Sequence, residues 1–307
     1  MSKNVLIFGA TGQQGGSTVM ALLESPQADS FTILGVTRNA SSASAKKLEA
    51  RGVKIVQGDM NDVPAIFAEA EKVAGGKIWG VFAVQLPPVG SKNATAIEEA
   101  HGKAVVDGAL AHGVKHFVYT SVERGGDDKS YDNPTNVPHF ISKHNIEHHL
   151  VDKAGDKMGW TILRPVAFMN NLQPGWAGKI FPTAWKIGLT RPLQLIAGSD
   201  IGHFGAQALI DPEKYNHRGI GLAGDELTFE EGDRIFKEQF GYSMPLTFEF
   251  LIRLLFWFVP DVGLMFKWFE SDGYAVDIGK LRAEHPGLKT WREFLQEQSG
   301  FEVKKRA

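Results

Sequence analysis

The amino-acid sequence predicts an α/β protein: a doubly wound parallel sheet of the Rossmann type, followed by a smaller α+β cap. In the first half, short apolar runs alternate with amphipathic stretches, and a glycine-rich turn directly follows the first run. Apolar strands separated by helices are typical of a parallel sheet buried on both faces, because right-handed crossovers place helices on each side. The periodicity changes after Pro165, which is where we expect the first domain to end.

The elements of the first domain follow one another as strand and helix. Strands are expected at residues 5–9, 31–37, 53–57, 78–84, 116–121 and 160–164. Helices are expected between them at residues 14–23, 43–50, 63–74, 94–111 and 138–154. This alternation assigns residues 1–165 to a nucleotide-binding domain.

Residues 166–307 are expected to form the cap, packed against the first domain, with some elements able to return to the sheet. The stretch 168–199 has no clear period, whereas helices are expected at 228–240 and 290–299. Between these helices lies the apolar run FEFLIRLLFWFV, residues 248–259. We interpret it as cap core and as one wall of a hydrophobic cleft. An exposed patch for dimerisation or a protein partner is the alternative, and a membrane span is disfavoured because about 20 residues are needed.

Composition excludes several classes of function. The chain of 307 residues is 43% hydrophobic with a formal net charge of −2, so no basic field attracts nucleic acid, and the basic tail Lys304, Lys305, Arg306 is read as a solvated chain end. It has no cysteine, which excludes disulfides and thiolate nucleophiles. The first apolar run is too short for a signal-peptide core. A cytoplasmic location is expected, with access to the nucleus left open.

The most informative motif is the turn VLIFGATGQQGG, in which Gly9, Gly12 and Gly15 are spaced as G-x-x-G-x-x-G between a strand and a helix. Gly9 permits the tight turn, Gly12 lets the backbone approach a diphosphate, and Gly15 lets the helix pack close to the strand. The phosphates then lie over the free N–H groups of the helix. The motif predicts a dinucleotide site.

Which dinucleotide binds is indicated by the end of the second strand. An NAD site places a carboxylate there for the ribose 2′-hydroxyl, but this chain has Arg38, and a guanidinium pairs well with a 2′-phosphate. NADP(H) is therefore the expected cofactor. By fold geometry, Asp59-Met60 flanks the adenine, and the turn from Gln85 and Leu86 to Pro88 lies near the nicotinamide ribose.

Several segments resemble the NmrA-like family, an atypical branch of the short-chain dehydrogenases/reductases. They include IFGATGQQGG, GDMND, VPHFISKHNIEHHL, LRPVAFMNNL and LAGDELTFEE. The resemblance spans nearly the whole chain, and it implies an NADP(H)-binding Rossmann domain with a small cap. Some relatives are redox sensors or negative regulators of transcription, and others are oxidoreductases. The implied cofactor contacts are Gly9, Thr11, Gly12, Gln13, Gln14, Gly15, Arg38, Asp59, Lys143 and the segment from Pro165 to Phe168, while Asn170 and Asn171 match the entry to the cap cleft.

The residues of the expected catalytic helix depart from the Tyr-x-x-x-Lys pair of active short-chain enzymes. Lys143 and Ser121 are present, but His139 stands four residues before the lysine. An imidazole can donate a proton, and Tyr131 in a polar loop could also reach the site. The simpler interpretation is that Lys143 binds ribose and His139 packs at the helix start. HNIEH matches an inverted zinc-peptidase pattern, but no third ligand is evident, so no metal is expected.

Two functions follow from these observations. The first is an NADP(H)-binding, redox-responsive sensor or regulator with little or no Tyr-Lys dehydrogenase activity, which acts through a protein partner or a homodimer. The second is an NADPH-dependent oxidoreductase of a small apolar carbonyl or enone, which uses His139 or Tyr131 with Ser121 and Lys143.

Overall fold

The computed structural model describes residues 2–87, 91 and 93–304. Pro88, at the end of the expected fourth turn, and Lys305 and Arg306 of the basic tail lie outside the described residues. The chain forms two compact units. The first comprises residues 1–122, 139–164 and 201–220, and the second comprises residues 123–138, 165–200 and 221–307.

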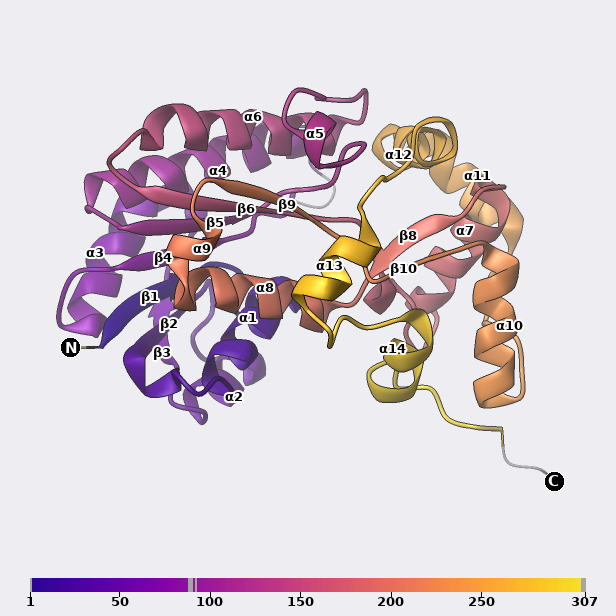
Figure 1. The fold of residues 1–307 in the computed structure, drawn as a ribbon, viewed down its shortest axis with the longest axis horizontal. Coiled ribbons are helices and arrows are strands. Elements are labelled where there is room, and N and C mark those ends of the chain that lie inside the picture. Colours follow the sequence, from indigo (N-terminus) through magenta and orange to yellow (C-terminus); the bar gives the residue numbers. More distant parts are fainter. Residues whose placement is uncertain (1, 88–90, 92, 305–307) are drawn as a thin grey trace. The chain divides into compact units, whose positions relative to one another are not determined.

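A seven-stranded sheet in the order β3-β2-β1-β4-β5-β6-β9 is the centre of the first unit (Figure 1). The strands are β1 Lys3–Ile7, β2 Phe31–Thr37, β3 Lys54–Gln57, β4 Gly80–Ala83, β5 His116–Thr120, β6 Gly159–Pro165 and β9 Arg218–Leu222. Pairings from β3 through β6 are parallel. His217 donates its amide to the carbonyl of Trp160, and Val166 donates to Leu222, so β9 runs in the same direction as β6.

Helices cover both faces of this sheet, as a parallel sheet requires. They are α1 Gln13–Leu23, α2 Ala43–Glu49, α3 Val63–Ala74, α4 Ala94–Ala111, α6 Pro138–Ala154, α8 Gly198–Ile210 and α9 Pro212–Tyr215, with short 3₁₀ turns at Ala28–Ser30 and Met60–Asp62. Phe67, Val105 and Ile146 bring α3, α4 and α6 into one buried core with the strands. On the other face α8 packs closely on α1 through Gly202 and on β4 through Gly205 (Figure 1).

The second unit is an α+β structure built on a small sheet in the order β10-β8-β7. Its strands are β7 Ala167–Phe168, β8 Leu193–Ile196 and β10 Asp225–Leu227, and its helices are α5 Asp127–Ser130, α7 Ile180–Gly188, α10 Phe229–Phe240, α11 Glu249–Phe258, α12 Pro260–Ser271, α13 Ile278–Glu284 and α14 Trp291–Glu297, with 3₁₀ turns at Met169–Asn171 and Ala177–Lys179. The indole rings of Trp185 and Trp291 meet edge to face at 6.0 Å and join α7 to α14.

The expected fold class is confirmed, and the five helices expected before Pro165 lie within a residue of their expected bounds, whereas α8 and α9 were not expected. The fourth strand is shorter than expected, at Gly80–Ala83, because the chain ends its pairing with β5 at Ala83. The expected boundary at residue 165 coincides with one of the points where the chain passes between units. The division into 1–165 and 166–307 stays a prediction, since α8 and the start of β9 belong to the first unit.

The interpretation of the aromatic run as cap core is wrong for α11. Ile252 is the buried residue of this helix, whereas Trp257 is 73% exposed. Other large apolar side chains on and beside it are exposed: Phe248, Phe250, Leu254, Phe258 and Val259. The following helix α12 does bury Phe266, Trp268 and Phe269. Burial in this segment therefore begins one helix later than the apolar run indicated.

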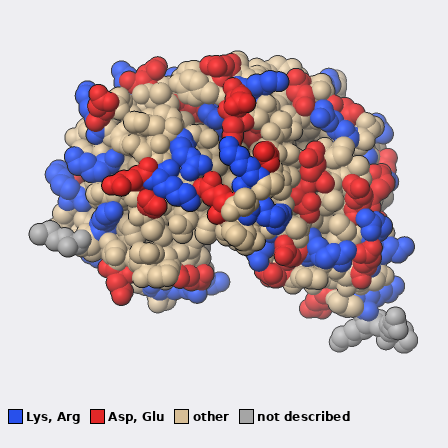
Figure 2. All heavy atoms as spheres, viewed as in Figure 1, with Lys and Arg blue, Asp and Glu red and all other residues tan. Residues whose placement is uncertain are grey.

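The surface carries charges of both signs. Figure 2 shows Lys and Arg interspersed with Asp and Glu over the visible face rather than gathered into one basic field. Within the part of the chain that the structure describes, no helix is both long and apolar enough to cross a membrane.

Candidate functional site

The glycine turn between β1 and α1 has the geometry that its sequence predicts. Gly9 adopts φ +67°, and a Cβ there would lie 2.6 Å from Cγ1 of Val84. A Cβ on Gly15 would meet the carbonyl oxygen of Gly9 and lie 2.8 Å from that of Phe8. These atoms belong to the backbone of β1 and its turn, so α1 packs this close to the strand only with glycine at residue 15.

The N-terminus of α1 leaves its first amides available. Gly12 is the N-cap residue, and no side chain in the described part of the protein accepts a hydrogen bond from the first amides of the helix. The first hydrogen bond of the helix runs from the amide of Gly16 to the carbonyl of Gly12 at 2.9 Å. The amides of Gln13, Gln14 and Gly15 precede that bond and face out of the helix end. Thr11, Gly12 and Gln13 are exposed. Such an end favours an anion, both through its N–H groups and through the helix dipole.

This helix end lies at the point where the order of the strands reverses, because β1 pairs with β2 on one side and with β4 on the other. In open parallel sheets, ligands bind outside the carboxyl ends of the strands at such a point. The contact between Gly9 and Val84 brings the end of β4 against the glycine turn. The next residue, Gln85, is therefore beside the turn as well.

Gln85 has an unusual side chain for a buried residue. It is 1% exposed, yet neither its amide nitrogen nor its amide oxygen has a hydrogen-bond partner among the described residues. The amide oxygen of Gln14, in the first turn of α1, is likewise buried without a partner. Buried polar atoms are nearly always hydrogen-bonded. Two unsatisfied amides beside an open helix end fit a polar ligand such as a dinucleotide.

Lys143 lies in α6 and contacts two other parts of the first unit. Its Nζ donates to the carbonyl oxygen of Gln85 at 3.3 Å and lies 3.0 Å from Oε1 of Glu98. The side chain of Lys143 is 12% exposed and that of Glu98 is fully buried. Ser142, also in α6, donates its hydroxyl to Oε2 of Glu98 at 2.5 Å. Glu98 lies in α4 outside any motif and was not among the residues expected from the sequence.

The other catalytic candidates are divided between the two units. Ser121 follows β5, is 3% exposed, and donates its amide to the carbonyl oxygen of Leu163 at 2.7 Å. His139 lies in the first turn of α6, and its ring meets the edge of Phe140 at 4.6 Å. Tyr131 belongs to the second unit, where it follows α5 and is partly buried. Ser121, His139 and Lys143 therefore share a unit that does not contain Tyr131.

The loop that carries Tyr131 is fixed by a buried carboxylate. Glu123 accepts hydrogen bonds from the amides of Gly126 and Ala275, the latter at 3.3 Å, and from the hydroxyl of Ser130 at 3.2 Å. Burial raises the pKa of Glu123, although these donors act in the opposite direction. The loop is thus anchored inside the second unit, whereas the sequence indicated a polar loop that could reach the site.

The adenine side of the expected site has an exposed cation. Arg38 directly follows β2, the neighbour of β1, and makes no hydrogen bond or ion pair in the described chain. Asp59 follows β3, and its carboxylate caps the next turn by accepting from the amide of Asn61 at 2.9 Å. Met60 packs partly buried against the core, and Leu86, beyond Gln85, is 75% exposed. The structure thus gives Asp59 a local structural role, and its contact with the cofactor stays a prediction.

Three further candidates lie in the second unit. The carbonyl of Pro165 accepts from the amide of Glu123 at 3.2 Å, and Phe168 ends β7. The side chain of Asn170 accepts from the amide of Gly198 at 2.7 Å, so this residue supports the start of α8. The contact of Pro165 and Phe168 with a cofactor stays a prediction, and so does the place of Asn170 at the entry to the cap cleft.

The zinc-like motif in α6 has a structural explanation. Glu147 is fully buried, and its Oε2 accepts from Nη2 of Arg164 at 2.8 Å, which leaves this carboxylate committed to an ion pair. No group of three metal-ligating side chains occurs among the residues that the structure describes.

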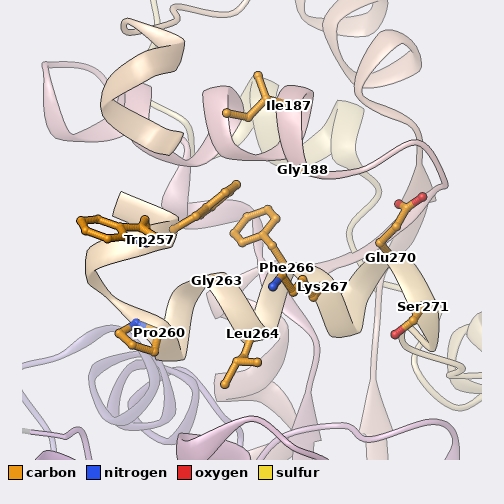
Figure 3. A pocket seen from close by; sticks show the side chains of 11 residues that line it. Ile187, Gly188, Trp257, Pro260, Gly263, Leu264, Phe266, Lys267, Glu270 and Ser271 are labelled. Carbon is orange, nitrogen blue, oxygen red and sulfur yellow. The ribbon is translucent and has the colours of Figure 1, made fainter. Parts of the chain in front are cut away.

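A separate apolar hollow of about 590 Å³ lies inside the second unit, between α7, α11 and α12. Figure 3 shows the ring of Phe266 directed into it beneath Ile187, with Glu270 and Ser271 at one end. The carboxylate of Glu270 already accepts from the amide and the hydroxyl of Thr190, at 2.9 and 2.5 Å. The hollow therefore has apolar walls and few available polar groups.

Fold and site together define a Rossmann-type protein with an open helix end and buried unsatisfied amides at the switch point of its sheet. The model of the NmrA-like family matches residues 1–284, and the chain belongs to that family. An NmrA-like family domain-containing protein of Dictyostelium discoideum is 35% identical over 150 residues, 49% of this chain and 45% of that protein. The NmrA-like family domain-containing oxidoreductase himF of Aspergillus japonicus is 32% identical over 58% of this chain and 47% of its own. The chain thus spans about half the length of these curated relatives.

Solved structures share the fold at low identity. The Citrobacter sp. triphenylmethane reductase, crystallised with NADP(H), has a TM-score of 0.71 and 18% identity, with 96% of this chain and 99% of that one covered. NmrA, a negative transcriptional regulator crystallised with NADP, has a TM-score of 0.64 and 16% identity, with 97% and 95% covered. At these identities the likeness shows the fold.

Proposed function

We propose that this protein binds NADP(H) and acts as a redox-responsive sensor or regulator, with little or no dehydrogenase activity of the Tyr-Lys type. The observation that carries the proposal is the open N-terminus of α1 beside the buried, unsatisfied amide of Gln85. An anion satisfies the first feature and a polar ligand group satisfies the second. The two solved structures with NADP(H) or NADP in the same fold support this choice of ligand.

Each part of the nucleotide has residues suited to it. The amides of Gln13 to Gly15 would hold the diphosphate, and the exposed guanidinium of Arg38 would pair with the 2′-phosphate. Lys143 and Gln85 would face the nicotinamide ribose. The nicotinamide supplies hydride chemistry when bound. What the protein does with that chemistry depends on the proton donors beside it.

Two features argue against standard catalysis. A Tyr-Lys pair works because the ammonium stabilises the ionised phenol, but this chain has His139 in place of the tyrosine. In addition, Glu98 lies 3.0 Å from the ammonium of Lys143 and offsets its positive field. Binding without turnover is the function that these residues serve best.

The affinity of nucleotide-stripped protein for NADPH, NADP and NADH, measured by calorimetry, tests the proposal. A redox-responsive protein must bind the reduced and oxidised forms with different affinities, because a ligand shifts an equilibrium only through differential binding. Equal affinities for NADPH and NADP would contradict the sensor, and no binding of any of the three would contradict the nucleotide site.

Arg38→Ala tests the choice between the two coenzymes. We expect NADPH to bind about 10-fold to 100-fold more weakly to this variant and NADH to bind as before, because a charge-assisted bond to the 2′-phosphate is lost. Lys47→Ala removes another exposed cation, from the last turn of α2, and is the matched control. If Arg38→Ala and Lys47→Ala weaken NADPH equally, Arg38 contributes only general charge.

The second candidate is an NADPH-dependent oxidoreductase of a small apolar carbonyl or enone. It is favoured by Ser121 and Lys143, which the chain retains, and by relatives named as oxidoreductases. Oxidation of NADPH measured with a panel of such compounds tests it. Turnover that is lost in Lys143→Ala and in either His139→Asn or Tyr131→Phe would support the enzyme over the sensor.

A further inference from the structure

Glu98 is a fully buried charge that contacts a residue of the expected nucleotide site, Lys143. It lies in the second turn of α4, is fully buried, and receives two groups of α6: the hydroxyl of Ser142 at 2.5 Å on Oε2 and the ammonium of Lys143 at 3.0 Å on Oε1. Oε1 of Glu98 has no hydrogen-bond partner among the described residues, so its contact with the ammonium is chiefly an attraction between charges. A buried carboxylate without such a partner would be costly.

The position of the ammonium is defined by these contacts. Lys143 has three N–H donors, one of which is directed to the carbonyl oxygen of Gln85, while Glu98 attracts the charge from the α4 side. A long lysine side chain otherwise loses considerable rotamer freedom on binding a ligand. Here that freedom is already removed by the protein, so binding is preorganised.

We propose that Glu98 is a positioning residue, which holds Lys143 in an ion pair with no net charge. This part of the site then recognises an uncharged group, the ribose diol next to the nicotinamide, and does not recognise a phosphate. This inference rests on the proposed nucleotide binding and extends it. A free ammonium attracts anions, whereas a paired one retains its N–H donors with little net charge. Anion recognition is then left to α1 and Arg38.

Glu98→Gln tests the proposal, because glutamine keeps the shape of the side chain and removes its charge. The probes are NADPH and adenosine 2′,5′-bisphosphate, which contains the adenine and 2′-phosphate but not the second ribose. We expect NADPH to bind at least about tenfold more weakly and the bisphosphate to bind as before. An unchanged affinity for NADPH, or an equal loss for both probes, overturns the proposal.

Glu99→Gln is the matched control. Glu99 is the next residue of α4 and also pairs with a lysine, Lys103 at 2.6 Å, but this pair is partly exposed. Asn145 donates to its other oxygen at 2.9 Å. Both probes should bind to Glu99→Gln as to the unchanged protein, and a loss equal to that in Glu98→Gln would show a general effect of charge in α4.

A double variant separates positioning from a purely structural role. Glu98→Gln leaves the Lys143 ammonium unpaired and should lower the melting temperature, whereas Glu98→Gln with Lys143→Met removes both charges and should restore much of it. The affinity for NADPH should stay low in the double variant. Recovery of both stability and NADPH affinity would show that Glu98 serves only the fold.

Failure of this inference differs from failure of the proposed function. If the unchanged protein binds neither NADPH nor the bisphosphate, the nucleotide site itself is wrong. If it binds both and Glu98→Gln leaves their ratio unchanged, only the role of Glu98 is wrong.

Discussion

His116, at the start of β5, is a buried titratable residue that makes stability depend on pH. Burial lowers the pKa of His116 to about 4, and the neighbouring charges of His217 and Lys3 act in the same direction. Its Nε2 lies 3.0 Å from the hydroxyl oxygen of Thr161, which donates to the carbonyl of Tyr215 at 2.9 Å. The neutral ring is therefore the form that the fold accommodates.

We expect this ring to destabilise the protein in mild acid. Between the unfolded pKa near 6.5 and the folded value of about 4, the unfolded chain binds more protons, so stability falls as pH falls through this window. The loss amounts to about 3 kcal/mol once the pH is below both values. Melting temperatures recorded from pH 7 to pH 4 should fall less steeply in His116→Gln than in the unchanged protein, and an equal slope in both would contradict the role of this ring.

Single residues differ in how well the sequence predicts them. Gly9, Gly15 and Lys143 were found from spacing, because each acts through neighbours close in the chain or through a fixed place in a known turn or helix. Glu98 was not found, because its partners Ser142 and Lys143 lie 44 and 45 residues away and the contact exists only once α4 and α6 pack together. A buried carboxylate has no local pattern that distinguishes it from one on a solvated helix face.

At the scale of elements, the packing of α1 onto β1 is the most demanding contact of the site. Gly15→Ala should destabilise the protein by about 1 to 3 kcal/mol and weaken nucleotide binding, because the new Cβ meets backbone carbonyls that cannot move aside. Denaturant unfolding and calorimetry measure the two effects. Gly279→Ala in α13 is the control, since a Cβ there lies 3.4 Å from the nearest side-chain atom, an ordinary contact. A stable, binding-competent Gly15→Ala would contradict the assigned geometry.

Element bounds were predictable where sequence signals are local. Val63–Ala74 begins after Asp62, which caps it, has proline at its second position, and ends at Gly75 with φ +72°. Thr228 and Glu231 form a capping box at the start of α10. The secondary structure of residues 168–199 could not be predicted from the sequence, because the short strands β7 and β8 are defined by their pairing with each other. Neither strand has a local period of apolar residues. Its 3₁₀ turns likewise have no periodic signature.

At the scale of the whole molecule, the division of the chain into two units could not be predicted from the single change of sequence pattern after Pro165. Residues 123–138 leave the sheet for the second unit, and residues 201–220 return to the first. Each excursion is decided by long-range contacts, such as that of Ala275 with Glu123. The sequence therefore predicts the class of fold and the geometry of the glycine turn, but not which later segments complete the sheet.

The exposed aromatic face of α11 is the remaining feature at this scale, and its energetics can be tested directly. Phe250, Trp257 and Phe258 are 59%, 73% and 67% exposed, so replacing all three by serine removes little buried area and should leave the melting temperature nearly unchanged. The same replacement should reduce the binding of an apolar dye, because contiguous apolar surface binds such dyes. It should also reduce any self-association of the protein that sedimentation detects as the protein concentration rises.

Ile252→Ser, on the same helix, provides the contrast. Ile252 is 3% exposed, and a polar side chain at its position loses apolar burial and introduces a hydroxyl without a partner, so the melting temperature should fall clearly. If the triple variant instead melts as early as Ile252→Ser, the three aromatic side chains are covered by the protein's own chain in solution. The fold would then contain a contact that places α11 in its core, as the apolar run alone had indicated.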